Sequence, residues 1–263
     1  MKALLSHAPG GPETLRIDEL PDPLAGAGEL LVRVRAAAIN FPDVLIIEDK
    51  YQMRPPRPFA PGGEISGEVE AVGEGVSGWN VGDRLIAVPG FGGLAEKIVI
   101  PAKAAIPLPP SRSFVDGAAL LLTYATSIHA LYDRGKLAYG QTLLVLGAAG
   151  GVGLAAIELG KARGARVIAA VSSEAKAQAA REAGADAAMV YPVGPFDPST
   201  SSGRAELKQL AEQFKAAVGP GGADVIYDPV GGDYAEPALR SIAWEGRYLV
   251  SGSRQGSPNC RST

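Results

Sequence analysis

The 263-residue sequence has one cysteine, Cys260, and two histidines, His7 and His129. A single cysteine excludes an intramolecular disulfide and fits a reducing compartment. Zinc in proteins is held by clusters of Cys, His and acidic side chains, and these three residues lie far apart along the chain. The sequence therefore predicts no metal site, either structural or catalytic.

The chain also lacks an excess of either charge and any long apolar run. Its 25 Lys and Arg residues stand against 28 Asp and Glu residues, which gives no reason to expect nucleic acid or an anionic membrane as partner. No segment approaches the roughly 20 apolar residues of a membrane span, and the N-terminus lacks the apolar core of a signal peptide. We expect a cytoplasmic protein without a membrane partner.

The residues that are present form two different patterns, which meet near residue 115. Residues 1–115 are rich in Gly and Pro and contain short runs of alternating apolar and polar residues. Such runs, separated by frequent turn signals, are typical of a compact β domain. The expected strands are 30–39, 64–76, 81–88 and 95–101.

From residue 116 to residue 252 the pattern alternates between helix and strand. This rhythm predicts an α/β domain with a doubly wound parallel sheet. The expected strands are 142–147, 165–171, 187–191, 223–228 and 247–252, and the expected helices are 116–133, 151–163, 174–183, 204–218 and 234–243. Residues 253–263 are rich in Ser, Arg, Asn and Pro, which predicts a disordered tail.

A glycine-rich stretch joins the first strand of the second domain to a helix. Its spacing is Ala148-x-Gly150-x-x-Gly153. A pyrophosphate can lie against the free N–H groups at the start of such a helix. Gly150 lets the backbone approach the phosphates, and Gly153 lets the helix pack against the strand. Ala148 replaces the first glycine of the usual fingerprint, a tolerable change where φ is negative. The stretch predicts dinucleotide binding.

The end of the second strand predicts which dinucleotide is bound. A site for NAD normally offers a carboxylate there, which grips the ribose hydroxyls. This strand ends at Val171, followed by Ser172 and Ser173, and Lys176 comes shortly after. Two hydroxyls and an ammonium favour a 2′-phosphate and therefore NADPH. Alternatively, Ser173 caps the next helix and Lys176 is solvated; the two roles can coexist.

The sequence resembles the zinc-free quinone oxidoreductases, the zeta-crystallin-like branch of the medium-chain dehydrogenases/reductases. The resemblance is carried by AAAINFPDVLIIEDKY, PFAPGGEISGEV, VGDRLIA, LTYATSIHALYDRGKLAYGQTLLVLGAAGGVG, ADVIYDPVGG and EGRYLVSG. It implies a GroES-like β domain over residues 1–115, a Rossmann domain over 116–252, NADPH in the cleft between them, and often a homodimer.

The resemblance also implies roles for individual residues. The substrate end of the cleft would be lined by Asn40 and Tyr51, and the nicotinamide would lie near Thr126. The pyrophosphate would meet Gly150, Gly151, Val152 and Gly153, and the 2′-phosphate would be surrounded by Ser172, Lys176 and Tyr191. On the far strands, the residues close to the cofactor would be Gly231 and Gly252.

The reaction expected from this family is hydride transfer from NADPH to a quinone or to an α,β-unsaturated carbonyl. Tyr51 could hydrogen-bond the acceptor oxygen or deliver a proton, and Asn40 could polarise the carbonyl. Each role has a plainer alternative. Tyr51 could simply pack in its loop, Thr126 could bond its own backbone, and Tyr191 could pack at the end of its strand.

The sequence departs from the family after Gly252. Family members continue with a sixth Rossmann strand, whereas this chain reads SRQGSPNCRST and stops. We therefore expect a sheet that is C-terminally truncated relative to the family, with an exposed edge where the strand used for dimerisation should pair. Two other functions stay open: a non-catalytic NADPH-binding or crystallin-like structural protein, and a reductase of acyl thioester enones.

Overall fold

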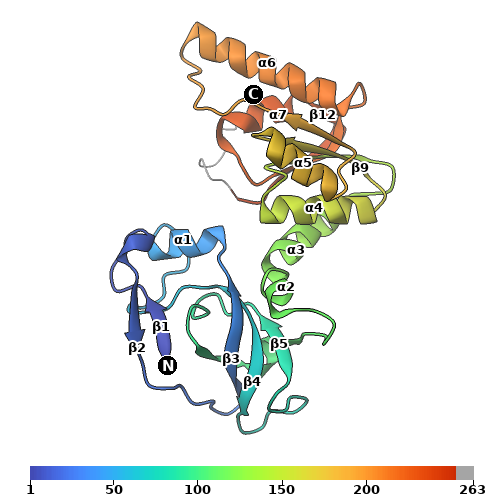
Figure 1. Ribbon diagram of the computed structural model, residues 1–263. Coiled ribbons are helices and arrows are strands. Elements are labelled where there is room, and N and C mark those ends of the chain that lie inside the picture. Colours follow the sequence, from blue (N-terminus) through green and yellow to red (C-terminus); the bar gives the residue numbers. More distant parts are fainter. Residues whose placement is uncertain (253–263) are drawn as a thin grey trace. The chain divides into compact units, whose positions relative to one another are not determined.

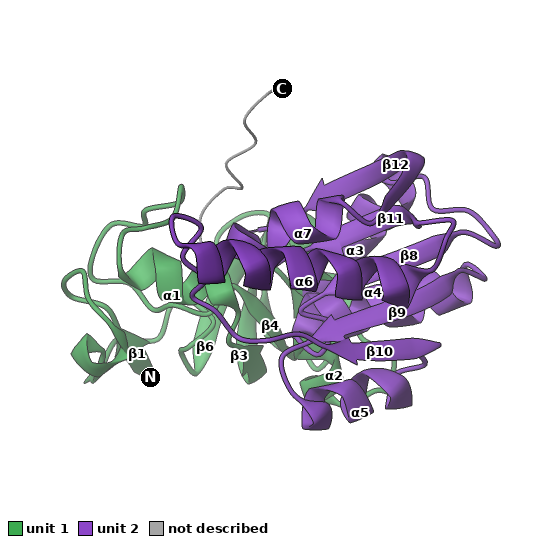
Figure 2. Ribbon diagram, turned by 90° about the horizontal axis from the view of Figure 1, so that it is seen from above, with its two compact units in different colours: residues 1–122 green, residues 123–263 purple. Residues whose placement is uncertain are grey.

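The computed structural model describes residues 1–252 (Figure 1). The predicted disordered tail, 253–263, lies outside the described residues. The described residues divide into two compact units, 1–122 and 123–252, drawn in green and purple in Figure 2.

Unit 1 is built on an antiparallel sheet with strand order β6-β3-β4-β5-β7. Its strands are β3 (Glu29–Ala38), β4 (Glu64–Val72), β5 (Arg84–Ala87), β6 (Lys97–Pro101) and β7 (Ile106–Pro107). A separate antiparallel pair consists of β1 (Lys2–Leu5) and β2 (Arg16–Glu19). The sheet core is apolar and includes Leu30, Val32, Ile65, Leu85 and Ile100. All four strands expected from the sequence are present.

Glycine is required at one point of this sheet. A Cβ on Gly67 in β4 would lie 2.3 Å from the carbonyl oxygen of Arg33 in β3. The register of this strand pair shifts directly after Val34, so the two backbones approach closely at an irregularity. The shift leaves one extra residue in β3, between Val34 and Ala36, as in a β-bulge.

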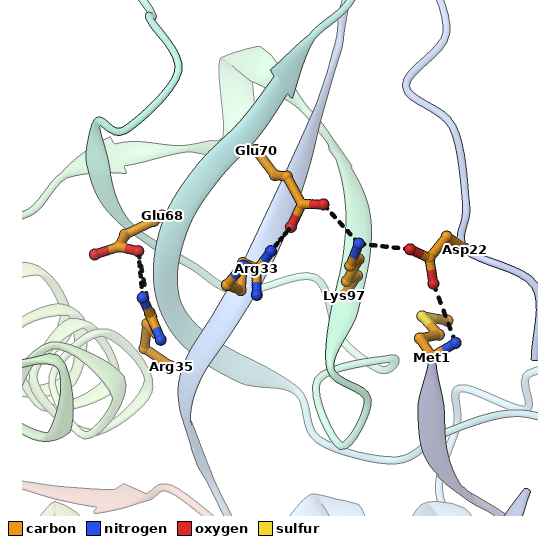
Figure 3. A network of polar contacts seen from close by, with 7 residues as sticks. All are labelled: Met1, Asp22, Arg33, Arg35, Glu68, Glu70 and Lys97. Atoms are coloured by element: carbon orange, nitrogen blue, oxygen red, sulfur yellow. Dashed lines mark hydrogen bonds and ion pairs between the residues drawn. The ribbon is translucent and has the colours of Figure 1, made fainter. Parts of the chain in front are cut away.

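A network of charged groups crosses three neighbouring strands of the unit 1 sheet, β6, β3 and β4 (Figure 3). Lys97 Nζ lies 2.5 Å from both Asp22 Oδ2 and Glu70 Oε1, and the Met1 amine lies 3.0 Å from Asp22 Oδ1. The hydrogen bonds to Asp22 and Glu70 raise the pKa of Lys97, and the hydrogen bond from Lys97 lowers the pKa of each carboxyl group. The network ties the N-terminal amine, β4 and β6 to the segment after β2. The pairs on its other side are Arg33 with Glu70 and Arg35 with Glu68.

The helical stretches expected over residues 116–133 form three pieces. They are α2 (Phe114–Ala118), α3 (Leu121–Ile128) and a π-helical turn, η3 (His129–Arg134). Ser113 caps α2 by accepting the N–H of Asp116, and α2 packs against β3, β4 and β5. Because α2 joins the first sheet, the boundary between the units lies at Leu122, seven residues after the position expected from composition.

Unit 2 is a doubly wound parallel sheet with strand order β10-β9-β8-β11-β12. Its strands are β8 (Thr142–Leu146), β9 (Arg166–Val171), β10 (Ala187–Val190), β11 (Ala223–Asp228) and β12 (Ile242–Val250). Its helices are α4 (Gly151–Ala162), α5 (Glu174–Glu182), α6 (Ser201–Val218) and α7 (Ala235–Leu239). The α/β fold class is therefore confirmed. The last expected helix ends earlier than predicted, because β12 begins at Ile242 and pairs with Ala223.

The central strand of unit 2 shows why the sheet is covered on both faces. Leu143 and Val145 of β8 belong to a core cluster with residues of α4, α5 and η3, whereas Leu144 and Leu146 belong to a second cluster with residues of α6 and α7. All four side chains are fully buried, as the continuous apolar run of a parallel strand predicts. Across residues 1–252, none of the helices combines the length and apolar character needed to cross a bilayer.

Candidate functional site

The carboxyl ends of the five parallel strands form one edge of the unit 2 sheet. Leu146 of β8 pairs with Ala170 of β9, and Val171 of β9 pairs with Val190 of β10. The strand order reverses between β8 and β11, and ligands of doubly wound sheets bind outside the carboxyl ends at such a point. The residues predicted to bind the cofactor follow these strand ends, except Thr126: Gly150–Gly153 after β8, Ser172 and Lys176 after β9, Tyr191 after β10, Gly231 after β11 and Gly252 after β12.

The turn after β8 is closed by backbone contacts. Gly147 has a φ of 57°, and its carbonyl oxygen accepts the N–H of Gly150 at 2.9 Å. A Cβ on Gly153 would lie 2.5 Å from that same carbonyl oxygen, so only glycine fits where α4 meets the turn. Ala148 has a negative φ and a fully buried side chain, and its N–H donates to Ala170 at 3.2 Å. Alanine is therefore compatible with the turn.

The first turn of α4 presents backbone N–H groups at this edge. Gly150 is the N-cap residue, and within residues 1–252 no side chain caps the helix. The first N–H groups of a helix have no intrahelical partner, and the helix dipole adds partial positive charge there. The N–H groups of Gly151, Val152 and Gly153 are thus suited to an anionic group such as a pyrophosphate.

The end of β9 combines a helix cap with a hydroxyl–lysine pair. Ser173 is the N-cap of α5, and its Oγ accepts the N–H of Lys176 at 3.4 Å. Lys176 Nζ donates to Ser172 Oγ at 2.8 Å, and the lysine is exposed. The first acidic side chain, Glu174, pairs instead with Arg181 at 2.8 Å. Capping by Ser173 and the pairing of Ser172 with Lys176 therefore coexist.

Tyr191 lies directly after β10, with its ring in the core. The side chain is buried, and its ring centroid lies 4.8 Å from that of Tyr234 and 6.5 Å from that of Phe214. Its N–H donates to the carbonyl of Val171 at 2.9 Å. The packing that the sequence left open for Tyr191 is thus present, and the backbone contact fixes the residue beside the end of β9.

Thr126 belongs to α3 rather than to the sheet edge. The next residue, Ser127, is fully buried and donates to the carbonyl oxygen of Val152 at 3.1 Å. Ser127 Oγ also lies 3.4 Å from the hydroxyl of Tyr227 in β11. These contacts hold the C-terminal part of α3 against the first turn of α4, which places half-buried Thr126 one residue from that contact.

Sequence reasoning missed Asp228, a carboxylate at the end of β11. The residue is fully buried, and its Oδ1 accepts the N–H groups of Val230 and Gly231 at 2.8 Å each. Its Oδ2 accepts the hydroxyl of Tyr248 in β12. Gly231 has a φ of 69°, which favours glycine. The signal was an acidic residue ending a strand just before Pro and two glycines, in the run YDPVGG.

In unit 1, Asn40 precedes α1 (Phe41–Ile47) and contacts two buried carboxylates. Its side-chain amide donates to Glu64 Oε2 at 3.1 Å, and its backbone N–H donates to Asp43 Oδ2 at 2.7 Å. Glu64 is the first residue of β4, so these contacts fix the start of α1 against the sheet. Tyr51 follows α1, is half-buried, and packs beside Ile46, Ile47 and Phe59.

The second oxygens of Asp43 and Glu64 bind backbone groups. Asp43 Oδ1 accepts the N–H groups of Gly62 and Gly63, and Glu64 Oε1 accepts the N–H of Leu122. These carboxylates therefore organise the loop before β4 and the start of α3. Within residues 1–252, no three His, Cys, Asp or Glu residues gather in a way that could hold a metal ion.

Comparison with protein families gives two matches. Residues 26–110 match the alcohol dehydrogenase GroES-like domain, and residues 151–262 match the family described as zinc-binding dehydrogenase. The bovine (Bos taurus) quinone oxidoreductase-like protein 2 is 40% identical over 230 residues, which cover 87% of this chain and 62% of that protein. The chain thus spans less than two thirds of that relative.

Solved structures are similar over most of the chain. A mycobacterial protein complexed with NADPH is 32% identical with a TM-score of 0.87, covering 100% of this chain and 77% of the other. The quinone oxidoreductase from Thermus thermophilus, solved alone and with NADPH, is 33% identical with a TM-score of 0.76, covering 94% of this chain and 72% of the other.

Proposed function

The chain belongs to the quinone oxidoreductase-like branch of the medium-chain dehydrogenase/reductase superfamily, and we propose that it uses NADPH to reduce a quinone or an α,β-unsaturated carbonyl without zinc. The observation that carries this proposal is the edge of the parallel sheet. There, the uncapped start of α4 and the Ser172–Lys176 pair follow neighbouring strands, β8 and β9. Two relatives with this fold were solved with NADPH.

In this proposal the unit 2 residues bind the cofactor. NADPH, when bound, supplies the hydride that reduces the acceptor. The N–H groups of Gly151, Val152 and Gly153 hold the pyrophosphate, and Gly150 leaves room for its approach. Lys176 and Ser172 bind the 2′-phosphate through charge-assisted hydrogen bonds. Tyr191 lies beside that phosphate, and Thr126 lies near the nicotinamide. Gly231 and Gly252 lie close to the cofactor at the ends of β11 and β12.

The selectivity for NADPH follows from charge. An aspartate at the tip of β9 would repel a 2′-phosphate, which carries close to two negative charges at neutral pH. Here the tip holds a serine hydroxyl and an ammonium 2.8 Å apart, and the nearest carboxylate along the chain, Glu174, is paired with Arg181. Both Lys176 and Ser172 can turn their donors toward a phosphate without the loss of a buried contact, because Lys176 is exposed.

Asn40 and Tyr51 of unit 1 are proposed to act on the acceptor. Glu64 holds the Asn40 amide by one N–H, which fixes the direction of the second amide N–H. That N–H can donate to a carbonyl oxygen and stabilise the negative charge that develops there. The Tyr51 hydroxyl can donate a hydrogen bond or a proton to the same kind of oxygen.

Oxidation of NADPH, followed by its absorbance, tests the proposed activity. The purified chain is assayed with a simple quinone, with a small enone and with an acyl thioester enone. Turnover of the quinone or the small enone supports the proposal, whereas turnover of the thioester alone supports the second reductase. Binding of NADPH without turnover of any acceptor contradicts catalysis and supports a binding or structural protein. A homodimer and a cytoplasmic location stay predictions.

A further inference from the structure

Asp228 is a buried carboxylate that the proposed reaction does not use. It ends β11 and is fully buried, and three donors reach its oxygens: the N–H groups of Val230 and Gly231 and the hydroxyl of Tyr248. A buried carboxylate is costly unless its oxygens are hydrogen-bonded. These contacts satisfy that need, and they also fix the course of the loop that follows β11.

This loop lies against the turn that follows β8. The Cγ2 atom of Val230 lies 2.8 Å from the position that a Cβ on Gly147 would take. Strands β8 and β11 pair directly, with Tyr227 opposite Val145. The strand order reverses between these two strands, so their loops form the two walls of the crevice in which doubly wound sheets bind ligands. Asp228 therefore shapes the wall opposite the glycine-rich turn.

We propose that Asp228 is a positioning residue for the nicotinamide half of the dinucleotide, an inference that rests on the proposed use of NADPH. The 2′-phosphate is assigned to Ser172 and Lys176, which follow β9 on one side of β8. The other half of the dinucleotide then extends across the reversal point toward β11, where Asp228 holds Gly231. Loss of the carboxylate leaves buried N–H groups without an acceptor, and the loop must shift to satisfy them.

The experiment compares three ligands by isothermal titration calorimetry: NADPH, NADH and adenosine 2′,5′-bisphosphate, which has only the adenosine half. The variant is Asp228→Ala. Its matched control is Asp224→Ala on the same strand, because Asp224 Oδ2 accepts the N–H of Thr142 at 2.8 Å at the opposite, amino end of β8. For Asp228→Ala we expect about tenfold weaker binding of both NADPH and NADH, with unchanged binding of the bisphosphate.

The control variant is expected to lower thermal stability without changing the ratio of NADPH affinity to bisphosphate affinity. Asp228→Asn keeps Oδ1 as an acceptor for Val230 and Gly231, so it should bind NADPH more tightly than the alanine variant. A general loss of stability would not restore NADPH affinity in the asparagine variant relative to the alanine variant, so this partial rescue distinguishes a positioning role from a structural one. The asparagine variant also preserves the test if the alanine variant does not fold.

Three results overturn the inference. The first is unchanged binding of NADPH by both Asp228 variants. The second is an equal loss of NADPH binding and bisphosphate binding in the asparagine variant. The third is a change in the ratio of NADPH affinity to bisphosphate affinity in Asp224→Ala that equals the change in Asp228→Ala. Two failures of the proposed function are seen separately. If the wild-type chain does not bind NADPH, the inference falls with the proposed cofactor; if it binds NADPH but turns over no acceptor, the proposed catalysis fails while the inference about binding is still tested.

Discussion

Lys176 Nζ donates a 2.8 Å hydrogen bond to Ser172 Oγ at the carboxyl end of β9, where NAD-binding sheets place a carboxylate. The ammonium is exposed, and its helix is capped independently by Ser173. Removal of the Lys176 side chain therefore leaves α5 capped. Because the cap and the charge come from different residues, the charge at the tip of β9 can be removed by mutation without loss of the helix cap.

Lys176→Ala is expected to weaken NADPH binding by about tenfold and to leave NADH binding nearly unchanged, because only NADPH carries the 2′-phosphate. Fluorescence titration with each cofactor measures the two dissociation constants. Lys208→Ala is a suitable control, since Lys208 is an exposed lysine on α6. Equal losses for NADPH and NADH would remove the argument from charge.

Gly153→Ala is expected to weaken NADPH and NADH equally and to lower stability by about 1–3 kcal/mol. The added Cβ would lie 2.5 Å from the carbonyl oxygen of Gly147, so α4 or the turn must move. Gly221→Ala is the control, because no atom lies within 4 Å of its added Cβ and its φ is not positive. Urea unfolding measures the stability, and titration measures the affinity for each cofactor. If the variant keeps the wild-type stability and the wild-type affinities, α4 does not approach the Gly147 carbonyl oxygen as closely as described.

Tyr51→Phe separates chemistry from packing. Phenylalanine keeps the ring beside Ile46, Ile47 and Phe59 and removes only the hydroxyl. If the hydroxyl delivers a proton, kcat is expected to fall by about a hundredfold while the NADPH dissociation constant is unchanged. Steady-state kinetics with a quinone and with an enone measure this change. An unaltered kcat with both acceptors leaves Tyr51 as a packing residue.

Lys97→Met is expected to lower the melting temperature, because Asp22 and Glu70 lose their shared ammonium. The pKa values of both carboxyl groups are lowered in the folded state, so their contribution is present above their ordinary values of 3.8 and 4.5 and is lost as the pH falls through the folded values. The pKa of Lys97 is raised, so its contribution persists up to its ordinary value of 10.5 and disappears above the folded value.

The difference in melting temperature between wild type and Lys97→Met should therefore be largest between about pH 5 and pH 10 and should shrink on acidification. Thermal unfolding across this range measures it. Added salt should reduce the difference, since the charges are near the surface. Lys103→Met serves as a control for the loss of an exposed lysine. A difference independent of pH and salt would contradict the electrostatic origin.

The residues proposed to bind the cofactor could be selected from the sequence because they form local patterns, and their binding roles stay predictions. The turn from Gly147 to Gly153 and the pair Ser172 and Lys176 are local patterns, and parallel strand ends meet at one edge by geometry. Asp228 was not predictable in the same way. Its role depends on Tyr248 in the next strand and on Val230 against Gly147, and these contacts arise only when β8, β11 and β12 pair.

The two carboxylates of unit 1 show the same limit. No role for Asp43 and Glu64 followed from the sequence, whereas folding directs them to the backbone of Gly62 and Leu122 and to the Asn40 amide. The boundary between the units lies at Leu122 and not near residue 115. The reason is that α2, although helical like the elements that follow it, packs against the sheet of unit 1.

The sequence by itself determined the two-part architecture, the glycine-rich strand–turn–helix after β8 and the hydroxyl–lysine tip of β9, because period, turn chemistry and charge act between near neighbours. Only the tertiary structure decided which buried carboxylates hold backbone loops in place, because a buried charge takes whichever donors the packed strands and helices bring to it.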